Sequence, residues 1–289
     1  MPTEPITSLS VNSADAIDEI DALPGEAEPR YEHWRHAGNQ GDLAKHALLL
    51  AAVAYIVERN RPQPFIYAES HAGPASHTME PEGAWTRGVE AFGRRISTVD
   101  AADQRWPALH PYVTTAFECP PREGLTYPGS HALVYRFLKN SGLRASLHLW
   151  DICPRVCGDL RLRYRQDAGV KIHREDGFQG IVQLPYADLA LIDPPSLDPR
   201  LVAQAIAGLA VRSGRFLCWV PRTGTREGGE DPVTQGFLEL VAEDYFVGTA
   251  QWRDWKPGLC GCAIVASTEL EEPLSAALTE LLWAMGWRP

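Results

Sequence analysis

The chain has 289 residues, which is enough for one large α/β domain with an insertion. It is 45% hydrophobic and 22% charged, and its net charge of −10 argues against capture of nucleic acid by a broadly basic surface, although a local basic groove is compatible with it. The longest apolar run, 46–57, is too short to cross a bilayer, and the acidic start lacks the features of a signal peptide. We therefore expect a cytoplasmic protein with no zinc site, because the spacing of its six cysteines matches no zinc pattern.

The first half of the chain begins with residues 1–29, which we predict to be a flexible acidic leader. Residues 30–289 are then expected to form the folded domain. Apolar patterning and turn residues in this half predict the following elements: a helix at 46–60, a buried strand at 65–68, a helix at 84–94 and a helix at 130–139.

The second half alternates between the two kinds of element. Strands are predicted at 145–152, 170–176, 187–193 and 215–221, and helices at 153–165, 177–184, 199–214 and 232–243. Two late strands near 245–252 and 262–267 are expected to pair as an antiparallel hairpin before a last helix at 273–285. Strands that alternate with helices predict an α/β fold built on a doubly wound, mostly parallel sheet.

Four predicted strands are followed by residues suited to binding a ligand. Ser70-His71-Ala72-Gly73 follows the first, the second ends in Asp151, the third in Asp176-Gly177, and the fourth in Asp193-Pro194-Pro195. In a doubly wound sheet, ligands bind beyond the carboxyl ends of the strands. A single acid at such a position is most simply a helix cap or a turn former.

The four positions together indicate a nucleoside-containing cofactor. A glycine loop lets the backbone approach a ligand closely, and a carboxylate such as Asp151 can accept both hydroxyls of a ribose. Asp176 is placed to accept an exocyclic amine of adenine, and Asp193 to polarise or deprotonate a substrate amine. This order is the one expected for S-adenosylmethionine (SAM) in a class I methyltransferase fold, which is Rossmann-like.

Several longer motifs carry a family resemblance. "YEHWRHAGNQGDLAKH" begins at Tyr31 and is followed in order by "SHAG", "YPGS", "DICP", "DGFQ", "IDPP" and "WVP". With these motifs the chain, from Tyr31 to about Ser267, resembles the RlmJ family, which methylates N6 of one adenine in bacterial 23S rRNA with SAM.

The resemblance implies roles for individual residues. A cofactor pocket would be lined by residues from several strand ends, namely His46, His71, Gly73, Ser130, Asp151, Asp176, Gly177 and Asp193. Asp193 would also be the catalytic residue, with Lys45 beneath it and with Tyr31 and His33 on a tail that closes over the reacting centre. The segment 75–126 would be a helical insertion that helps to hold RNA. Tyr31 as a surface anchor, His46 as a core histidine and Lys45 as a solvated charge are the alternatives.

The substrate end departs from the family pattern at Ser196, where adenine-N6 methyltransferases place an aromatic ring that stacks on the extruded base. Pro74 after Gly73 and the acidic charge also depart from it, while the arginines of 161–165 are read as a solvated helix face or as RNA contacts. We therefore expect a SAM-binding enzyme that acts on an amine of a small metabolite in a biosynthetic pathway, with Pro194, Ser196 and Trp219 near the substrate.

Three hypotheses stay open at this point. The small-metabolite enzyme transfers a methyl group or promotes an intramolecular cyclisation, of which aziridine formation is one example, and a small partner protein could complete its site. The second hypothesis is a 23S rRNA adenine-N6 methyltransferase in which Trp219 or Tyr31 replaces the missing ring. The third is a non-catalytic binding protein. The presence of Asp193 and Lys45 counts against it, because such a protein has no chemical need for them.

Overall fold

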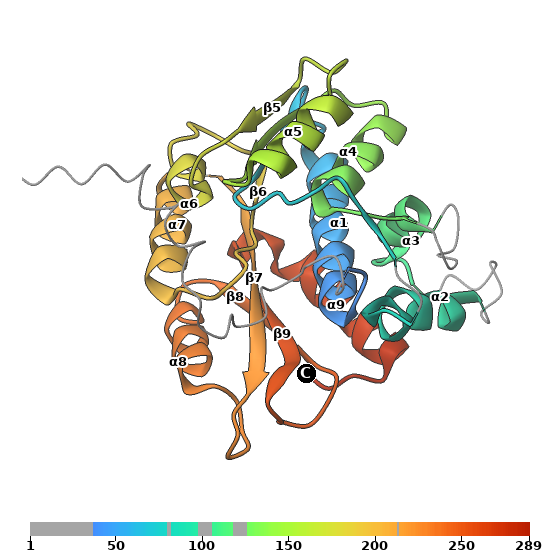
Figure 1. Cartoon of the computed structure of the whole chain (residues 1–289), viewed down its shortest axis with the longest axis vertical. Coiled ribbons are helices and arrows are strands. Elements are labelled where there is room, and N and C mark those ends of the chain that lie inside the picture. The colour runs from blue at the N-terminus through green and yellow to red at the C-terminus, as the bar shows by residue number, and fades with distance from the viewer. Residues whose placement is uncertain (1–36, 80–81, 98–105, 118–125, 213) are drawn as a thin grey trace, which may run out of the picture. The chain divides into compact units, whose positions relative to one another are not determined.

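A seven-stranded sheet forms the centre of the computed structural model (Figure 1), in the order β5-β4-β1-β6-β7-β9-β8. The structure describes residues 37–79, 82–97, 106–117, 126–212 and 214–289, which lie in the unit Trp34–Pro289. The strands of the sheet are β1 (Phe65–Glu69), β4 (Ala145–Trp150), β5 (Val170–His173), β6 (Leu189–Ile192), β7 (Phe216–Gly224), β8 (Phe246–Gln251) and β9 (Gly258–Ala266).

Strand directions confirm the predicted fold class. β1 pairs in parallel with β4 and β6, β4 with β5, and β6 with β7. β9 runs antiparallel to both β7 and β8, so the predicted late hairpin is present. Its second strand, β9, lies between β7 and its first strand, β8, which forms the edge of the sheet. A parallel sheet with a single antiparallel strand, β9, next to one edge is the arrangement of a class I methyltransferase, in which the carboxyl ends of the parallel strands share one edge.

Helices cover both faces of this sheet, as a doubly wound fold requires. One buried cluster joins the sheet to residues of α1, α4 and α9, and the other joins it to residues of α6, α7 and α8. The longer helices are α1 (Gln40–Asn60), α2 (Val89–Ser97), α4 (Ser130–Asn140), α5 (Pro154–Arg163), α7 (Pro199–Val211), α8 (Pro232–Val241) and α9 (Glu271–Met285).

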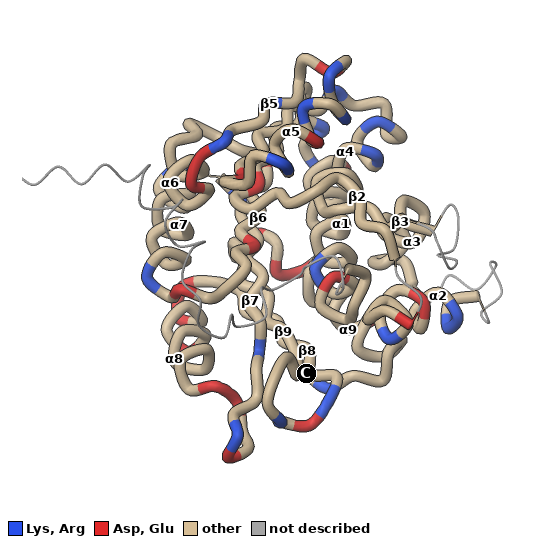
Figure 2. The backbone as a smooth tube through the Cα atoms, in the orientation of Figure 1, with Lys and Arg blue, Asp and Glu red and all other residues tan. Residues whose placement is uncertain are grey.

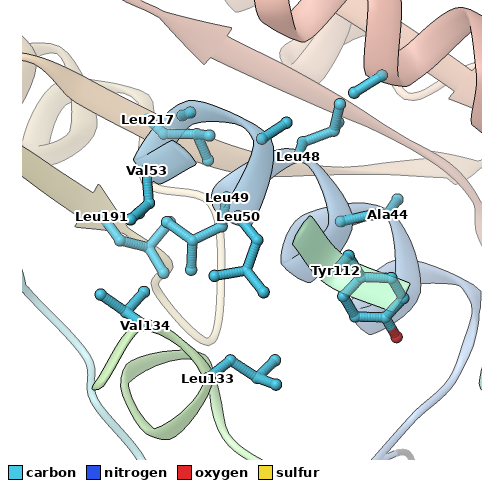
Figure 3. Close-up of a cluster of buried hydrophobic side chains, with 14 of the residues drawn as sticks. Ala44, Leu48, Leu49, Leu50, Val53, Tyr112, Leu133, Val134, Leu191 and Leu217 are labelled. Atoms are coloured by element: carbon cyan, nitrogen blue, oxygen red, sulfur yellow. The ribbon is translucent and has the colours of Figure 1, made fainter. Parts of the chain in front are cut away.

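Helix α1 is the central helix of the first face and is buried along most of its length. In Figure 3, Leu49, Leu50 and Val53 of α1 lie among side chains of the sheet and of α4. Full burial of one leucine side chain contributes about 2 kcal/mol. The predicted start of this helix at residue 46 is wrong by more than a turn, because Asn39 caps the helix by accepting a hydrogen bond from the amide of Asp42 (2.9 Å). This early start places Asp42 and Lys45 on the helix.

The single helix predicted at 84–94 is instead two short elements. A 3-10 turn, η3 (Ala84–Arg87), ends at Gly88, and α2 begins at Val89. A Cβ at Gly88 would lie 2.1 Å from the carbonyl oxygen of Gly38, so only glycine permits the backbones to cross there. The break therefore has a tertiary cause that helical periodicity does not reveal.

Three elements in and next to the segment 75–126 are absent from the sequence prediction. They are β2 (Ser76–Thr78), α3 (His110–Ala116) and β3 (Thr126–Pro128), and β2 and β3 form a separate antiparallel pair. Strands of three residues carry little periodic signal, and their partners lie about 50 residues apart along the chain. The described part of the segment is mainly helical.

Among the described helices, none has the length and apolar character needed to cross a membrane.

Candidate active site

Three acids predicted from the sequence lie at the same edge of the sheet. Asp151 directly follows β4, Asp193 directly follows β6, and Asp176 lies between β5 and the short helix α6 (Gly177–Ile181). The loop Ser70–Gly73 follows β1, which lies between β4 and β6. Since these strands are parallel neighbours, their carboxyl ends gather the four segments in one place.

The glycine loop is bonded to Asp151. Gly73 has a φ of +61°, and its amide donates to Oδ2 of Asp151 (3.1 Å). The amide of Cys153 donates to Oδ1 of the same carboxylate (2.7 Å). Asp151 is half-buried, and each of its oxygens keeps a second lone pair. Pro74 has no amide hydrogen, so the loop offers one donor fewer than an all-glycine loop would.

Asp176 caps helix α6, because its Oδ1 accepts a hydrogen bond from the amide of Gln179 (2.9 Å). Asp176 therefore has the helix-capping role that is the simplest interpretation of a strand-end acid. Its second carboxylate oxygen stays available, because the residue is exposed. Gly177 packs against the loop after β1, where a Cβ would lie 1.5 Å from the carbonyl oxygen of Ser70. Glycine at position 177 thus allows backbone contact between α6 and the loop Ser70–Gly73.

A buried carboxyl at the end of β1 was missed in the sequence. Glu69 is fully buried and accepts hydrogen bonds from the hydroxyls of Tyr67 (2.9 Å) and Ser130. Burial raises the pKa of Glu69 to about 8, against the effect of these two hydrogen bonds. Glu69 ends its strand as Asp151 and Asp193 follow theirs, so the same strand-end signal could have found it.

The two histidines predicted to line the pocket have different surroundings. His71 is half-buried, its Nδ1 lies 2.8 Å from the Ser70 hydroxyl, and its ring meets the edge of Phe178. His46 is buried, and its Nδ1 lies 2.8 Å from the hydroxyl of Tyr127. The geometry of His46 is that of a satisfied core histidine, whereas His71 lies in the loop at the sheet edge.

Asp193 forms an ion pair with Lys45, 148 residues earlier in the chain. Nζ of Lys45 lies 2.6 Å from Oδ2 of Asp193 and 3.1 Å from Oδ1 of Asp42. Asp42 also accepts a hydrogen bond from the amide of Gly38 (2.8 Å). The Lys45 side chain is only 7% exposed, so its interpretation as a solvated helix charge is wrong. Asp42, the third member of this cluster, was missed, although it lies three residues before Lys45 on the helix.

The two carboxylates keep Lys45 charged. Burial opposes the charge, but the neighbouring Asp193 and Asp42 raise the pKa of the Lys45 ammonium above its usual range. Lys45 is therefore a fixed cation at neutral pH and cannot accept a proton from a substrate. It holds Oδ2 of Asp193 in place, which leaves Oδ1 for another partner.

The residues predicted near the substrate differ in burial and in their contacts with this ion pair. Pro194 is buried, whereas Ser196 is exposed and presents only a hydroxyl. The ring centroid of Trp219 on β7 lies 6.0 Å from Nζ of Lys45, and its buried indole nitrogen has no hydrogen-bond partner. A Cβ at Gly41 would lie 3.1 Å from this ring, so the start of α1 packs against Trp219. Tyr31 and His33 lie outside the described residues.

The residues present fit SAM. One part of this fit is the set of acceptors, since each oxygen of Asp151 keeps a second lone pair and one oxygen of Asp176 accepts no hydrogen bond from its own turn. The other part is room, because nothing lies within 4 Å of a Cβ built on Gly73. In the described residues there is no group of three His, Cys, Asp or Glu side chains that could hold a metal ion.

The chain is similar in sequence and in structure to known proteins. No family model matches the chain. The chain is 28% identical over 201 residues to ribosomal RNA large subunit methyltransferase J of Escherichia coli, which covers 66% of this chain and 69% of that protein. The protein of that name from Haemophilus influenzae is 27% identical over 207 residues, with the same coverage. A crystal structure of a Legionella pneumophila protein from family DUF519 has a TM-score of 0.66 and 19% identity, covering 86% of this chain and 94% of that one. The last comparison shows a shared fold.

Proposed function

The chain is related to the ribosomal RNA large subunit methyltransferase J proteins and is an enzyme of the SAM-dependent methyltransferase class, and from this premise we propose that it acts on an amine of a small metabolite. The observation that carries this proposal is the pairing of Asp193 with Lys45 beside an exposed Ser196. Asp193 supplies an acceptor suited to an amine, and residue 196 supplies no ring for a flat base, which supports the proposal.

The chemistry follows from which atoms are free. Oδ1 of Asp193 and the carbonyl of Pro194 are the acceptors that would hold two N–H groups of a substrate amine. Held in this way, the nitrogen lone pair would be directed away from both acceptors and would stay available for attack on an electrophile. When bound, SAM supplies an electrophilic methyl group. Lys45 stays protonated and fixes the orientation of Asp193.

An intramolecular cyclisation would use the same groups. The amine nitrogen would form a bond to a carbon of its own molecule, a leaving group on that carbon would depart with its electron pair, and the amine proton would pass to Asp193 or water. Aziridine formation is one such reaction, in a biosynthetic pathway. The amine site that holds the nitrogen is common to both reactions, so the assignment of substrate class does not depend on which of them occurs.

A second candidate function is adenine-N6 methylation of 23S rRNA. The names of the curated relatives favour it, and so does Trp219, whose partly buried ring lies beside Lys45 and could take the role of the missing aromatic residue. Stacking of one base on an aromatic side chain contributes about 1–3 kcal/mol.

The experiment that tests the proposal follows transfer of label from methyl-labelled SAM. One reaction holds 23S rRNA that lacks its N6 mark, and the other holds the low-molecular-weight amine fraction of the source cells. We expect label, or a SAM-independent mass change of an amine, only in the second. Asp193→Asn should abolish it, while Asp198→Asn, which alters a helix cap five residues away, should not.

Labelled rRNA would overturn the small-metabolite proposal. In that case Trp219→Ala should reduce the labelling about 10- to 100-fold if the indole is the stacking platform. Ser196→Tyr would then be expected to raise it, because it restores the ring of the family pattern.

A further inference from the structure

A concave site separate from the sheet edge lies between α4 and the β2–β3 pair. Its volume is about 570 Å³, which falls within the range of small-molecule sites. Its walls come from three parts of the chain: Tyr135 on α4, Phe117 after α3, and Thr126 on β3. Tyr127 and Tyr164 form the floor and are buried.

The charges around this site have one sign. Arg136, Lys139 and Arg163 line it, and no Asp or Glu is among its described lining residues. Lys139 is partly neutralised by Asp167 (3.1 Å), but in the described part of the chain neither arginine makes an ion pair. In Figure 2, Lys and Arg segments lie along α4 and α5. A protein with a net charge of −10 thus concentrates positive charge at one hollow.

One of the guanidinium groups is held in place before any ligand binds. Nη1 of Arg136 donates to the carbonyl oxygen of Thr115 (3.0 Å), which is a neutral partner and leaves the positive charge uncompensated. A guanidinium presents several N–H groups in a plane, and it matches a phosphate better than an ammonium does. The other N–H groups of Arg136 and those of Arg163 are therefore suited to an anion.

The aromatic walls indicate what accompanies that anion. Phe117 and Tyr135 are half-buried, so parts of their rings face the hollow, and the volume exceeds what an inorganic phosphate ion requires. We propose that this site binds a small phosphorylated compound with a flat ring, of the class of a nucleoside monophosphate. The phosphate would lie at Arg136 and Arg163, and the ring against the aromatic wall.

The two tyrosines of the floor are hydrogen-bonded to histidines that lie next to predicted active-site residues. The hydroxyl of Tyr127 lies 2.8 Å from Nδ1 of His46, the residue next to Lys45 on α1. The hydroxyl of Tyr164 lies 2.9 Å from Nδ1 of His131, which follows Ser130 at the start of α4. The floor of the hollow therefore contacts two helices, α1 and α4, that also carry Lys45 and Ser130.

Binding of AMP to the full chain tests the proposal, and calorimetry in saturating S-adenosylhomocysteine keeps AMP out of the cofactor pocket. We expect AMP to bind, and adenosine and inorganic phosphate to bind more weakly. Arg136→Gln and Arg163→Gln should each weaken AMP binding about 10- to 100-fold, the range for hydrogen bonds to charged groups. Arg161→Gln is the matched control, because this exposed residue of α5 does not line the site, and it should change affinity less than about twofold.

Absence of AMP binding, or equal binding by the Arg136→Gln/Arg163→Gln double variant with an unchanged thermal midpoint, would overturn the proposal. A single-stranded hexanucleotide that binds in dependence on both arginines, while AMP does not bind, would also overturn it, since the occupant would then be an RNA strand. Arg136→Lys keeps the charge and loses the planar donors, so a retained affinity in that variant would contradict the assigned phosphate geometry.

Discussion

The carboxylates at the carboxyl ends of the parallel strands are held in different ways on the two sides of β1. At β4 and β5, Asp151 and Asp176 accept hydrogen bonds only from backbone amides: Asp176 from Gln179 in its own turn, and Asp151 from Cys153 and from Gly73 of the neighbouring loop after β1. At β6, Asp193 is paired with a buried ammonium that comes from α1, 148 residues away. The first arrangement uses neutral backbone donors and leaves acceptor lone pairs for a hydroxyl-rich ligand. The second is long-range and fixes a charge, which is suited to a reacting amine.

The largest effect should follow from removing the shared cation. Lys45→Met leaves Asp42 and Asp193 facing each other without a counter-ion, and we expect the free energy of unfolding to fall by about 3–5 kcal/mol. Urea denaturation measures this. The control is Lys139→Met, which removes a half-exposed partner of Asp167 and should cost at most about 1 kcal/mol. Similar losses in both variants would mean that the buried Lys45 ion pairs contribute no more to stability than a half-exposed pair does.

The next largest effect concerns the packing of the loop after β1. Gly177→Ala places a Cβ against the Ser70 carbonyl, so the loop after β1 must move, and we expect the affinity for S-adenosylhomocysteine to fall at least about tenfold with a stability loss of about 1–3 kcal/mol. Gly158→Ala on α5 meets nothing within 4 Å and should raise stability by up to about 1 kcal/mol. Unchanged affinity in Gly177→Ala would show that the cofactor does not depend on this loop.

The pH dependence of stability tests the carboxyl of Glu69, which ends β1 between the two sides. The folded pKa of Glu69 is raised from 4.5 to about 8, so its contribution to stability is fully present below about pH 4.5 and is lost as pH rises through 8. Relative to Glu69→Gln, the wild type should lose about 1 kcal/mol of unfolding free energy per pH unit between about pH 5 and pH 8. Parallel pH profiles of the two proteins would mean that Glu69 is ionised in the folded state.

The smallest effect separates a helix cap from a ligand contact. Asp176→Ala and Asp198→Ala each remove a side chain that caps a helix, and each should cost about 1 kcal/mol. Only Asp176→Ala should also weaken binding of S-adenosylhomocysteine, because Asp176 follows a strand of the cofactor edge, whereas Asp198 caps α7. Calorimetry on both variants measures this, and equal affinities would assign Asp176 a structural role alone.

Strand-end acids could be predicted from the sequence because each is local to its strand. The order of Asp151, Asp176 and Asp193 along the chain, together with the alternation of elements, predicted both the doubly wound sheet and the cofactor class. Periodicity could not predict the break at Gly88, because the cause is a crossing with the backbone of Gly38. It also could not predict β2 and β3, since three-residue strands owe their pairing to distant contacts.

By itself, the sequence determined the alternation of strands and helices, the acids that end the strands and the absence of a ring at Ser196, because these depend on neighbouring residues along the chain. Only the tertiary structure decided which charges meet. Lys45 lies on a helix whose pattern is simply apolar, and its role arises because α1 packs across the sheet and brings the ammonium between Asp42 and Asp193. The same holds for Arg136 and Arg163, which are ordinary surface residues in the sequence and converge on one hollow only after α4 and α5 have packed.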